Sequence, residues 1–150
     1  MSDPTFNILL VEDNPDHAEL ILRSFRDHAF VNTVHHVADG EAALDYLFRN
    51  GEYADPKRSP SPHVILLDLR LPKVDGLEVL RSVKAREDLR RIPVVILTSS
   101  ESERDLTRAY DHFANSYLVK PVDFEKFIGL MHELGFYWLQ WNRSLQGPQE

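Results

Sequence analysis

Three carboxylates, a hydroxyl and an ammonium group stand at the ends of short apolar runs in this sequence. They belong to Glu12, Asp13, Asp68, Thr98 and Lys120. Carboxylates that crowd together repel one another, so such a cluster persists only where a cation or a proton offsets the repulsion. A carboxylate can also attack phosphorus as a nucleophile and form an aspartyl-phosphate. These residue types therefore indicate a cation site combined with phosphoryl transfer to a carboxylate.

Asp68 is the candidate nucleophile, because it alone ends the predicted central strand. An unpaired carboxylate at the end of a buried apolar strand has a large desolvation cost, which favours a functional role over a structural one. Phosphoryl transfer depends mainly on positioning and on neutralisation of charge. A metal ion, the Lys120 ammonium and the Thr98 hydroxyl are suitable groups for both tasks.

Mg²⁺ is the cation that this set of residues favours, because it prefers hard oxygen ligands and needs only one or two carboxylates besides water and phosphate oxygens. Zinc has little support, since the sequence contains no cysteine and no histidine pair at helical spacing beside the carboxylates. His35 and His36 are neighbours on a predicted strand and point to opposite faces. One buried and one exposed histidine are expected there, rather than a metal site.

The elements that position these groups follow from the alternation of two patterns. Short apolar, β-branched runs alternate with longer segments whose apolar residues recur every three or four positions, which predicts βαβ units and a parallel sheet. Ligands bind such sheets at the carboxyl ends of the strands, where the polar groups above converge. The five predicted strands cover residues 7–11, 33–37, 64–67, 93–97 and 116–119.

Helices are predicted after each strand, and most of them follow a residue that can cap a helix. The first three begin after Asn14-Pro15, Asp39-Gly40 and Asp75-Gly76; the fourth covers about 105–112, and the fifth begins at Asp123. Residues 49–62 are rich in proline, serine and charge and predict an extended surface loop. Residues 136–150 form an aromatic C-terminal extension, too short for a second domain.

Bulk properties exclude several classes of protein. A chain of 150 residues is expected to form a single domain. Its net charge of -7 and scattered basic residues argue against nucleic-acid binding. No apolar segment is long enough to cross a membrane and no secretory signal is present, so a soluble cytoplasmic protein is expected. Neither glycine-rich nucleotide-binding motif occurs, so a nucleotide-binding module has no support.

Four motifs, in order and at suitable intervals, resemble those of response-regulator receiver domains in two-component systems. They are Leu9-Leu10-Val11-Glu12-Asp13-Asn14, Leu66-Leu67-Asp68-Leu69-Arg70-Leu71-Pro72-Lys73-Val74-Asp75-Gly76, Ile96-Leu97-Thr98-Ser99 and Leu118-Val119-Lys120-Pro121. The resemblance covers residues 7 to about 134. It implies an α/β fold with a doubly wound, five-stranded parallel sheet of the flavodoxin-like order 2-1-3-4-5, and five helices.

The resemblance also implies roles for single residues. Asp68 is then the phosphoacceptor, and a Mg²⁺ ion is held by Asp13 directly, by Glu12 through water and by Asp68. The backbone carbonyl of Arg70 is a further metal ligand. Thr98 then donates to the phosphoryl group and Lys120 pairs with it.

Two positions near Lys120 also match the family. Pro121 is expected to follow a cis peptide bond. Tyr117 matches an aromatic switch residue that turns inward when Thr98 moves, although by itself it is better explained as a core residue.

Within the family, the long loop before the third strand and the Trp138-Leu139-Gln140-Trp141 tail resemble single-domain regulators of bacterial phytochrome histidine kinases. A red-light-sensing kinase is the implied phosphodonor. With no output domain, a signal is expected to leave through contacts with other proteins. The face formed by helix 4, strand 5 and helix 5, extended by the aromatic tail, is a candidate homodimer or kinase-docking surface. The alternative is that the tail packs on its own domain.

Two other functions compete with this hypothesis. The first is an enzyme with an aspartyl nucleophile, such as a dehalogenase-like phosphatase. These phosphatases resemble one another in having an Asp-x-Asp-x-Thr motif after the first strand. Here the segment is Glu12-Asp13-Asn14-Pro15-Asp16. A pseudo-receiver that works as an adaptor without phosphorylation is the other alternative, and the complete set of Asp13, Asp68, Thr98 and Lys120 argues against it. We therefore expect a phosphoacceptor switch and not an enzyme.

Overall fold

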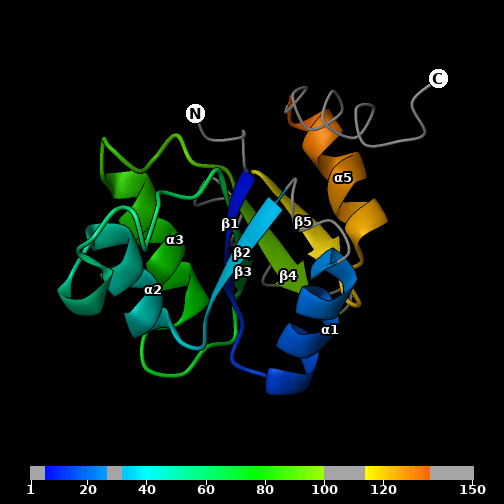
Figure 1. The fold of residues 1–150 in the computed structure, drawn as a ribbon, viewed down its shortest axis with the longest axis horizontal. Helices are drawn as coiled ribbons and strands as arrows, with labels where there is room; N and C mark the ends of the chain where they lie inside the picture. Colours follow the sequence, from blue (N-terminus) through cyan, green and yellow to red (C-terminus); the bar gives the residue numbers. More distant parts are fainter. Residues whose placement is uncertain (1–5, 27–31, 100–113, 136–150) are drawn as a thin grey trace.

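The computed structural model describes residues 6–26, 32–99 and 114–135. Within these ranges, five strands form one parallel sheet in the order β2-β1-β3-β4-β5 (Figure 1). The strands are β1 (Phe6–Val11), β2 (Asn32–Val37), β3 (Val64–Asp68), β4 (Val94–Thr98) and β5 (Ser116–Val119). The predicted doubly wound fold and its strand order are confirmed.

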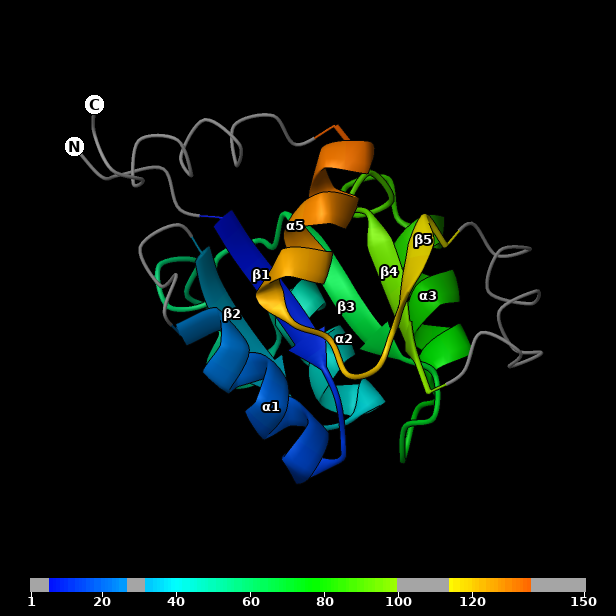
Figure 2. The same ribbon diagram turned by 90° about the vertical axis from the view of Figure 1, so that its right-hand side faces the viewer.

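Helices cover both faces of the sheet. α1 (Pro15–Arg26) and α5 (Phe124–Glu133) lie on one face, and α2 (Gly40–Phe48) and α3 (Gly76–Ala85) on the other (Figures 1 and 2). The fourth predicted helix, at 105–112, and the aromatic extension at 136–150 lie outside the described residues. Among the described residues, no helix has the length and apolar character needed to cross a membrane.

The central strands are buried on both faces, which explains their unbroken apolar character. Ile8 and Leu10 of β1 pack in the core layer under α1 and α5. Leu9 and Val11, the alternate residues, pack in the layer under α2 and α3. This two-sided burial holds the strand ends, and the residues that follow them, in fixed positions.

Side-chain caps explain where the helices begin. Asn14 Oδ1 accepts hydrogen bonds from the backbone N–H groups of Asp16 and His17 at the start of α1. The N-cap aspartates of α2, α3 and α5 each accept from the backbone N–H three residues later. Each cap satisfies donors that the first turn of a helix leaves unpaired. Those N-cap aspartates are Asp39, Asp75 and Asp123.

The predicted extended loop before β3 contains one short 3-10 helix, Gly51–Tyr53. Hydrogen bonds from two side chains fix the loop to the end of α2. The Tyr46 hydroxyl donates to the Pro60 carbonyl over 2.8 Å, and an Arg49 guanidinium nitrogen donates to the Ser59 carbonyl over 3.1 Å. The loop is therefore tied to α2 near its C-terminal end, at Ser59 and Pro60.

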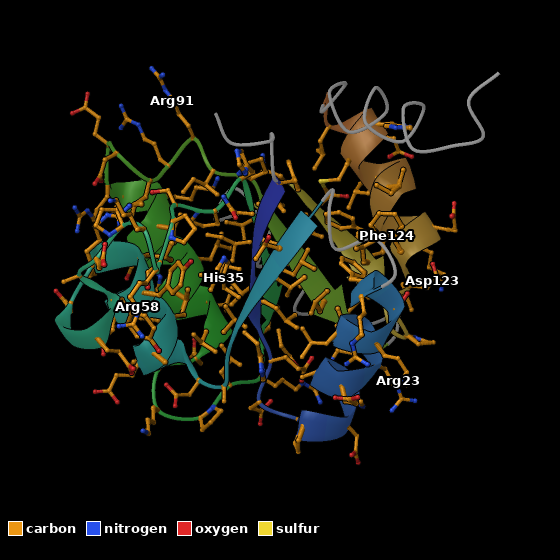
Figure 3. The ribbon with its side chains drawn as sticks, viewed as in Figure 1. Arg23, His35, Arg58, Arg91, Asp123 and Phe124 are labelled. Atoms are coloured by element: carbon orange, nitrogen blue, oxygen red, sulfur yellow. The ribbon has the colours of Figure 1, made fainter. Side chains whose placement is uncertain are left out.

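The two histidines of β2 lie on opposite faces of the strand, as predicted. His35 is half-buried and its ring centroid lies 5.8 Å from that of Tyr46 on α2. Figure 3 shows His35 and Phe124, which packs against α1, on opposite sides of the sheet. His36 is exposed, and its Nε2 lies 2.8 Å from the Glu12 backbone oxygen.

A His35→Leu variant should reveal a pH-dependent contribution to stability. Burial lowers the pKa of His35, and its Nε2 has no hydrogen-bond partner among the described residues. Because the folded state then has the lower pKa, the unfolded state binds more protons in the pH range just below the ordinary histidine value. The free energy of unfolding therefore falls as the pH drops through that range.

Melting temperatures measured between about pH 7 and about pH 5.5, on either side of the ordinary histidine pKa, test this expectation. The wild-type temperature should fall more steeply than that of His35→Leu. His63, whose pKa burial also lowers, is present in both proteins, so its contribution cancels. Parallel curves would show that His35 does not titrate differently on folding.

Candidate functional site

The parallel register brings the predicted site residues to one edge of the sheet. Val11 of β1 pairs with Leu67 of β3, Asp68 with Leu97 of β4, and Thr98 with Val119 of β5. The residues at or just after these strand ends line one pocket of about 250 Å³. Its lining includes Glu12, Asp13, Asp68, Arg70, Thr98 and Lys120.

Three carboxylates meet in this pocket. Glu12, Asp13 and Asp68 each place one oxygen within 4.8 Å of the others. The Glu12 side chain is fully buried, that of Asp68 is 12% exposed, and Asp13 is exposed. A set of carboxylate oxygens that combines buried members with one open to solvent fits Mg²⁺, which accepts hard oxygen ligands and retains water.

Lys120 lies between two of these carboxylates. Its Nζ is 2.8 Å from Glu12 Oε1 and 2.9 Å from Asp68 Oδ2. Burial alone lowers the pKa of Lys120, but the hydrogen bonds and charges of Glu12 and Asp68 outweigh it and raise that pKa above its ordinary value. Lys120 therefore remains an ammonium ion and offsets part of the negative charge in the pocket.

Glu12 is the fully buried carboxylate of the pocket. Burial raises the pKa of Glu12, contact with Lys120 opposes this rise, and the charge of Asp68 adds to it. The other carboxylate oxygen, Oε2, accepts a hydrogen bond from the Asn14 backbone over 3.2 Å. Glu12 is thus held from two sides, although its charged form is disfavoured by burial.

Asp68 is fixed by the loop that follows β3. Its Oδ1 accepts a hydrogen bond from the Arg70 backbone N–H over 2.9 Å, while Oδ2 contacts Lys120. Gly76, at the start of α3, packs against the same loop and donates its N–H to the Leu69 carbonyl over 3.0 Å. The Arg70 side chain is exposed at the pocket wall.

Thr98 and Lys120 are linked through the backbone. Thr98 is 1% exposed, and its carbonyl accepts a hydrogen bond from the Lys120 N–H over 2.7 Å. The Lys120-Pro121 peptide bond is cis, as the family resemblance implies. Tyr117 is half-buried on β5 and packs against the core layer under α2 and α3. The described residues thus include every predicted site residue.

One residue at the site is absent from the sequence-based expectations. His17, in the first turn of α1, lines the pocket, and its Nδ1 lies 3.1 Å from Lys120 Nζ. The sequence contains one indication of this role: His17 is a polar residue in the first turn of a helix that begins beside Asp13. Its partner lies 103 residues away in the sequence, so spacing alone does not reveal the contact.

A doubly wound sheet with an acidic pocket and a lysine at its carboxyl edge defines a class of signalling domain. The model of the response regulator receiver domain family matches residues 8–132, and the chain belongs to this family. Two curated relatives support the assignment over nearly their whole lengths. "Probable methanogenesis regulatory protein FilR2" of Methanothrix harundinacea is 51% identical and is matched over 97% of this chain and 90% of that protein. Response regulator Rcp1 of Synechocystis sp. is 38% identical over 93% of this chain and 92% of its own length.

Solved structures point to the same family. The bacteriophytochrome response regulator AtBRR superposes with a TM-score of 0.78 at 48% identity, covering 89% of this chain and 94% of that one. The phosphorylated cyanobacterial phytochrome response regulator RcpA gives 0.73 at 38% identity, with coverage of 90% and 94%. The receiver domain of the histidine kinase PA1611 of Pseudomonas aeruginosa, with magnesium in its active-site cleft, gives 0.69 at 30% identity and coverage of 86% and 96%.

Proposed function

We propose that this protein is a single-domain response regulator that accepts a phosphoryl group on Asp68 in a Mg²⁺-dependent reaction. The observation that carries the proposal is the Asp68 carboxylate at the wall of an open pocket, between the Lys120 ammonium and two further carboxylates. Family membership and the phosphorylated state of the related RcpA support it. In this proposal residues 1–150 form one receiver domain, with 136–150 as its extension.

The reaction forms a bond between an Asp68 carboxylate oxygen and phosphorus, while the bond from phosphorus to the donor's leaving atom breaks. Glu12, Asp13, Asp68 and the Arg70 backbone carbonyl are the residues proposed to hold Mg²⁺. When bound, the ion neutralises charge on the phosphoryl oxygens. The Lys120 ammonium pairs with the phosphoryl group, and the Thr98 hydroxyl donates a hydrogen bond to it.

Incubation with acetyl phosphate, followed by measurement of the intact mass, tests this proposal. With Mg²⁺ the protein should gain one labile phosphoryl group, and with a chelator in place of Mg²⁺ it should gain none or far less. Uptake at the same rate without a divalent cation would contradict the metal-dependent mechanism. No uptake under either condition would contradict the phosphoacceptor function.

A Lys120→Met variant should take up the phosphoryl group about 100-fold more slowly, because removal of one preorganised charge-stabilising group costs a factor of this order. Methionine retains much of the side-chain length and removes the charge. It also leaves Glu12 and Asp68 without their shared cation. The initial rate of uptake from acetyl phosphate, at saturating Mg²⁺, gives the measurement. Lys57→Met, at an exposed position in the loop before β3, is the matched control and should retain the wild-type rate.

We propose a histidine kinase as the physiological phosphodonor, and a phytochrome kinase in particular. Support comes from the likeness to AtBRR and RcpA, which are phytochrome response regulators. A histidine kinase takes its phosphoryl group from ATP, which is available in the cytoplasm. The regulator that receives this group is therefore proposed to be cytoplasmic as well. Transfer from a phosphorylated bacteriophytochrome kinase should be faster than transfer from an unrelated histidine kinase. Equal rates would contradict the phytochrome assignment.

We propose that the protein is a phosphorylation switch and not an enzyme acting on external substrates. Phosphorylation adds negative charge at Asp68. The Thr98 hydroxyl then moves toward the phosphoryl group, and Tyr117 turns inward in response. The aspartyl-phosphate then decays by hydrolysis within the domain, at a rate that the exposed Arg70 side chain can influence. Steady release of phosphate from many phosphate esters would contradict this and favour a phosphatase.

We propose that a homodimer forms through the face of helix 4, β5 and α5, together with the C-terminal extension. Along β5 and α5 the described residues form an open groove of about 460 Å³, lined in part by Tyr117, Leu130 and Glu133. A face of this kind suits a protein that signals through protein contacts. Sedimentation with and without phosphorylation should show a dimer in at least one state. A monomer in both states would refute it.

A further inference from the structure

His17 contacts Lys120 from the side of α1, which carries none of the receiver motifs. The distance from His17 Nδ1 to Lys120 Nζ is 3.1 Å. A lysine ammonium only donates hydrogen bonds, so Nδ1 is the acceptor nitrogen of the imidazole in this contact. The His17 side chain is 41% exposed, so the ring is not held there as a core residue. Its contact with the ammonium is the feature that needs an explanation.

Three atoms from three different parts of the fold surround the ammonium: Asp68 Oδ2 and His17 Nδ1 are its hydrogen-bond partners, and Glu12 Oε1 forms an ion pair with it. Glu12 Oε1 lies 2.8 Å away, Asp68 Oδ2 2.9 Å away and His17 Nδ1 3.1 Å away. A lysine side chain has a flexible four-carbon stem, so its ammonium position depends on these contacts. With the His17 imidazole in place, the side chain is fixed on the α1 side as well as on the carboxylate side.

Hydrogen bonds that connect α1 to the acidic pocket also fix the position of His17. Asn14 Oδ1 accepts the His17 backbone N–H over 3.1 Å. The Asn14 backbone N–H donates to Glu12 Oε2 over 3.2 Å, so the residue that begins α1 is tied to the acidic pocket. His17 also lines an adjacent, mostly apolar groove of about 250 Å³ with Leu20 and Pro121. It therefore stands at the border between the pocket and the neighbouring surface.

We propose that His17 is a positioning residue for phosphoryl transfer, which holds the Lys120 ammonium toward Asp68. The proposal rests on the proposed function of Asp68. The two carboxylates attract the ammonium through full opposite charges, whereas the imidazole offers a lone pair without a negative charge. When a phosphoryl oxygen enters the pocket, Lys120 therefore loses least by breaking its hydrogen bond to the imidazole and donating that N–H group to the phosphoryl oxygen. His17 orients the ammonium before the reaction and releases one of its N–H groups during it.

Substitutions that keep or remove the acceptor test this role. His17→Leu should lower the maximal rate of uptake from acetyl phosphate about 5- to 10-fold, the effect of losing one net hydrogen bond. His17→Gln, whose side-chain oxygen can accept, should stay within about twofold of the wild type. The Mg²⁺ concentration that gives half the maximal rate should be the same in all three proteins, since Lys120 does not bind the metal. His17→Met, whose thioether sulfur is only a weak acceptor, should be close to His17→Leu.

Glu19→Gln is the control on the same helix, because Glu19 pairs with the exposed Arg23 away from the pocket. It should retain the wild-type rate and Mg²⁺ dependence. Melting curves of all variants show whether each one is folded at the assay temperature. Equal rates for the leucine, methionine and glutamine variants, or a leucine variant as fast as wild type, would overturn the positioning role. Failure of the wild type to take up a phosphoryl group would instead overturn the proposed function.

Discussion

An Asp68→Asn variant is expected to take up no phosphoryl group from acetyl phosphate and Mg²⁺, whereas the wild type takes up one. A carboxylate oxygen can attack phosphorus, but an amide cannot replace it as a nucleophile under these conditions. The amide oxygen can still accept a hydrogen bond from the Arg70 N–H or from Lys120, the two groups that contact Asp68. We therefore expect loss of function in a folded protein.

The intact mass after incubation gives the result, and circular dichroism shows that the variant is folded. Asp16→Asn is the matched control, because Asp16 is exposed at the start of α1 and its backbone, not its side chain, contributes to the helix cap. This control should be phosphorylated like the wild type. Full phosphorylation of Asp68→Asn would show that the phosphoacceptor is a residue other than Asp68.

A Gly76→Ala variant is expected to be destabilised by about 3 kcal/mol, near the upper end of the cost of overpacking a buried position. An added Cβ would lie 2.4 Å from Leu69 Cα and 2.6 Å from the Asp68 carbonyl oxygen. Both are backbone atoms, so no side-chain rotation relieves the contact. Either α3 or the loop after β3 has to move, and that loop holds Asp68 through the Arg70 N–H. Slower uptake of the phosphoryl group should accompany the loss of stability.

Gly129→Ala is the control for the change from glycine to alanine. Gly129 lies within α5, and an added Cβ meets no atom within 4 Å. Alanine in a helix is favoured over glycine by about 0.5–1 kcal/mol, so this variant should be slightly more stable than the wild type. Urea denaturation of the three proteins measures both effects. A Gly76→Ala protein as stable as the wild type would mean that the packing at the start of α3 is looser than described.

The sheet and the acidic pocket could be predicted from the sequence because their signals are local. Each strand is a short apolar run, and the polar residue after it has to lie at the carboxyl edge of a parallel sheet. Asp68 could be predicted for this reason, and so could the helix starts at Asp39, Asp75 and Asp123. The cis bond before Pro121 followed from the motif that contains it.

Other features depend on contacts between distant residues, which spacing does not encode. The loop at 49–62 reads as an extended surface segment, yet the Tyr46 hydroxyl and the Arg49 side chain hold it from α2. Arg49 adopts a φ of 61°, a conformation for which the sequence gives no glycine signal. His17 reaches Lys120 only because α1 and the end of β5 meet at the same sheet edge.

The site of phosphorylation in the wild-type protein is the most direct test of the central claim. Borohydride reduces an acyl phosphate to an alcohol, which converts a phosphorylated aspartate to homoserine and leaves phosphate esters unchanged. After Mg²⁺-dependent phosphorylation, reduction and proteolysis, tandem mass spectrometry should find homoserine at position 68 and at no other aspartate. Homoserine at another aspartate, or phosphate retained on a serine, threonine or histidine with Asp68 unmodified, would contradict Asp68 as the phosphoacceptor.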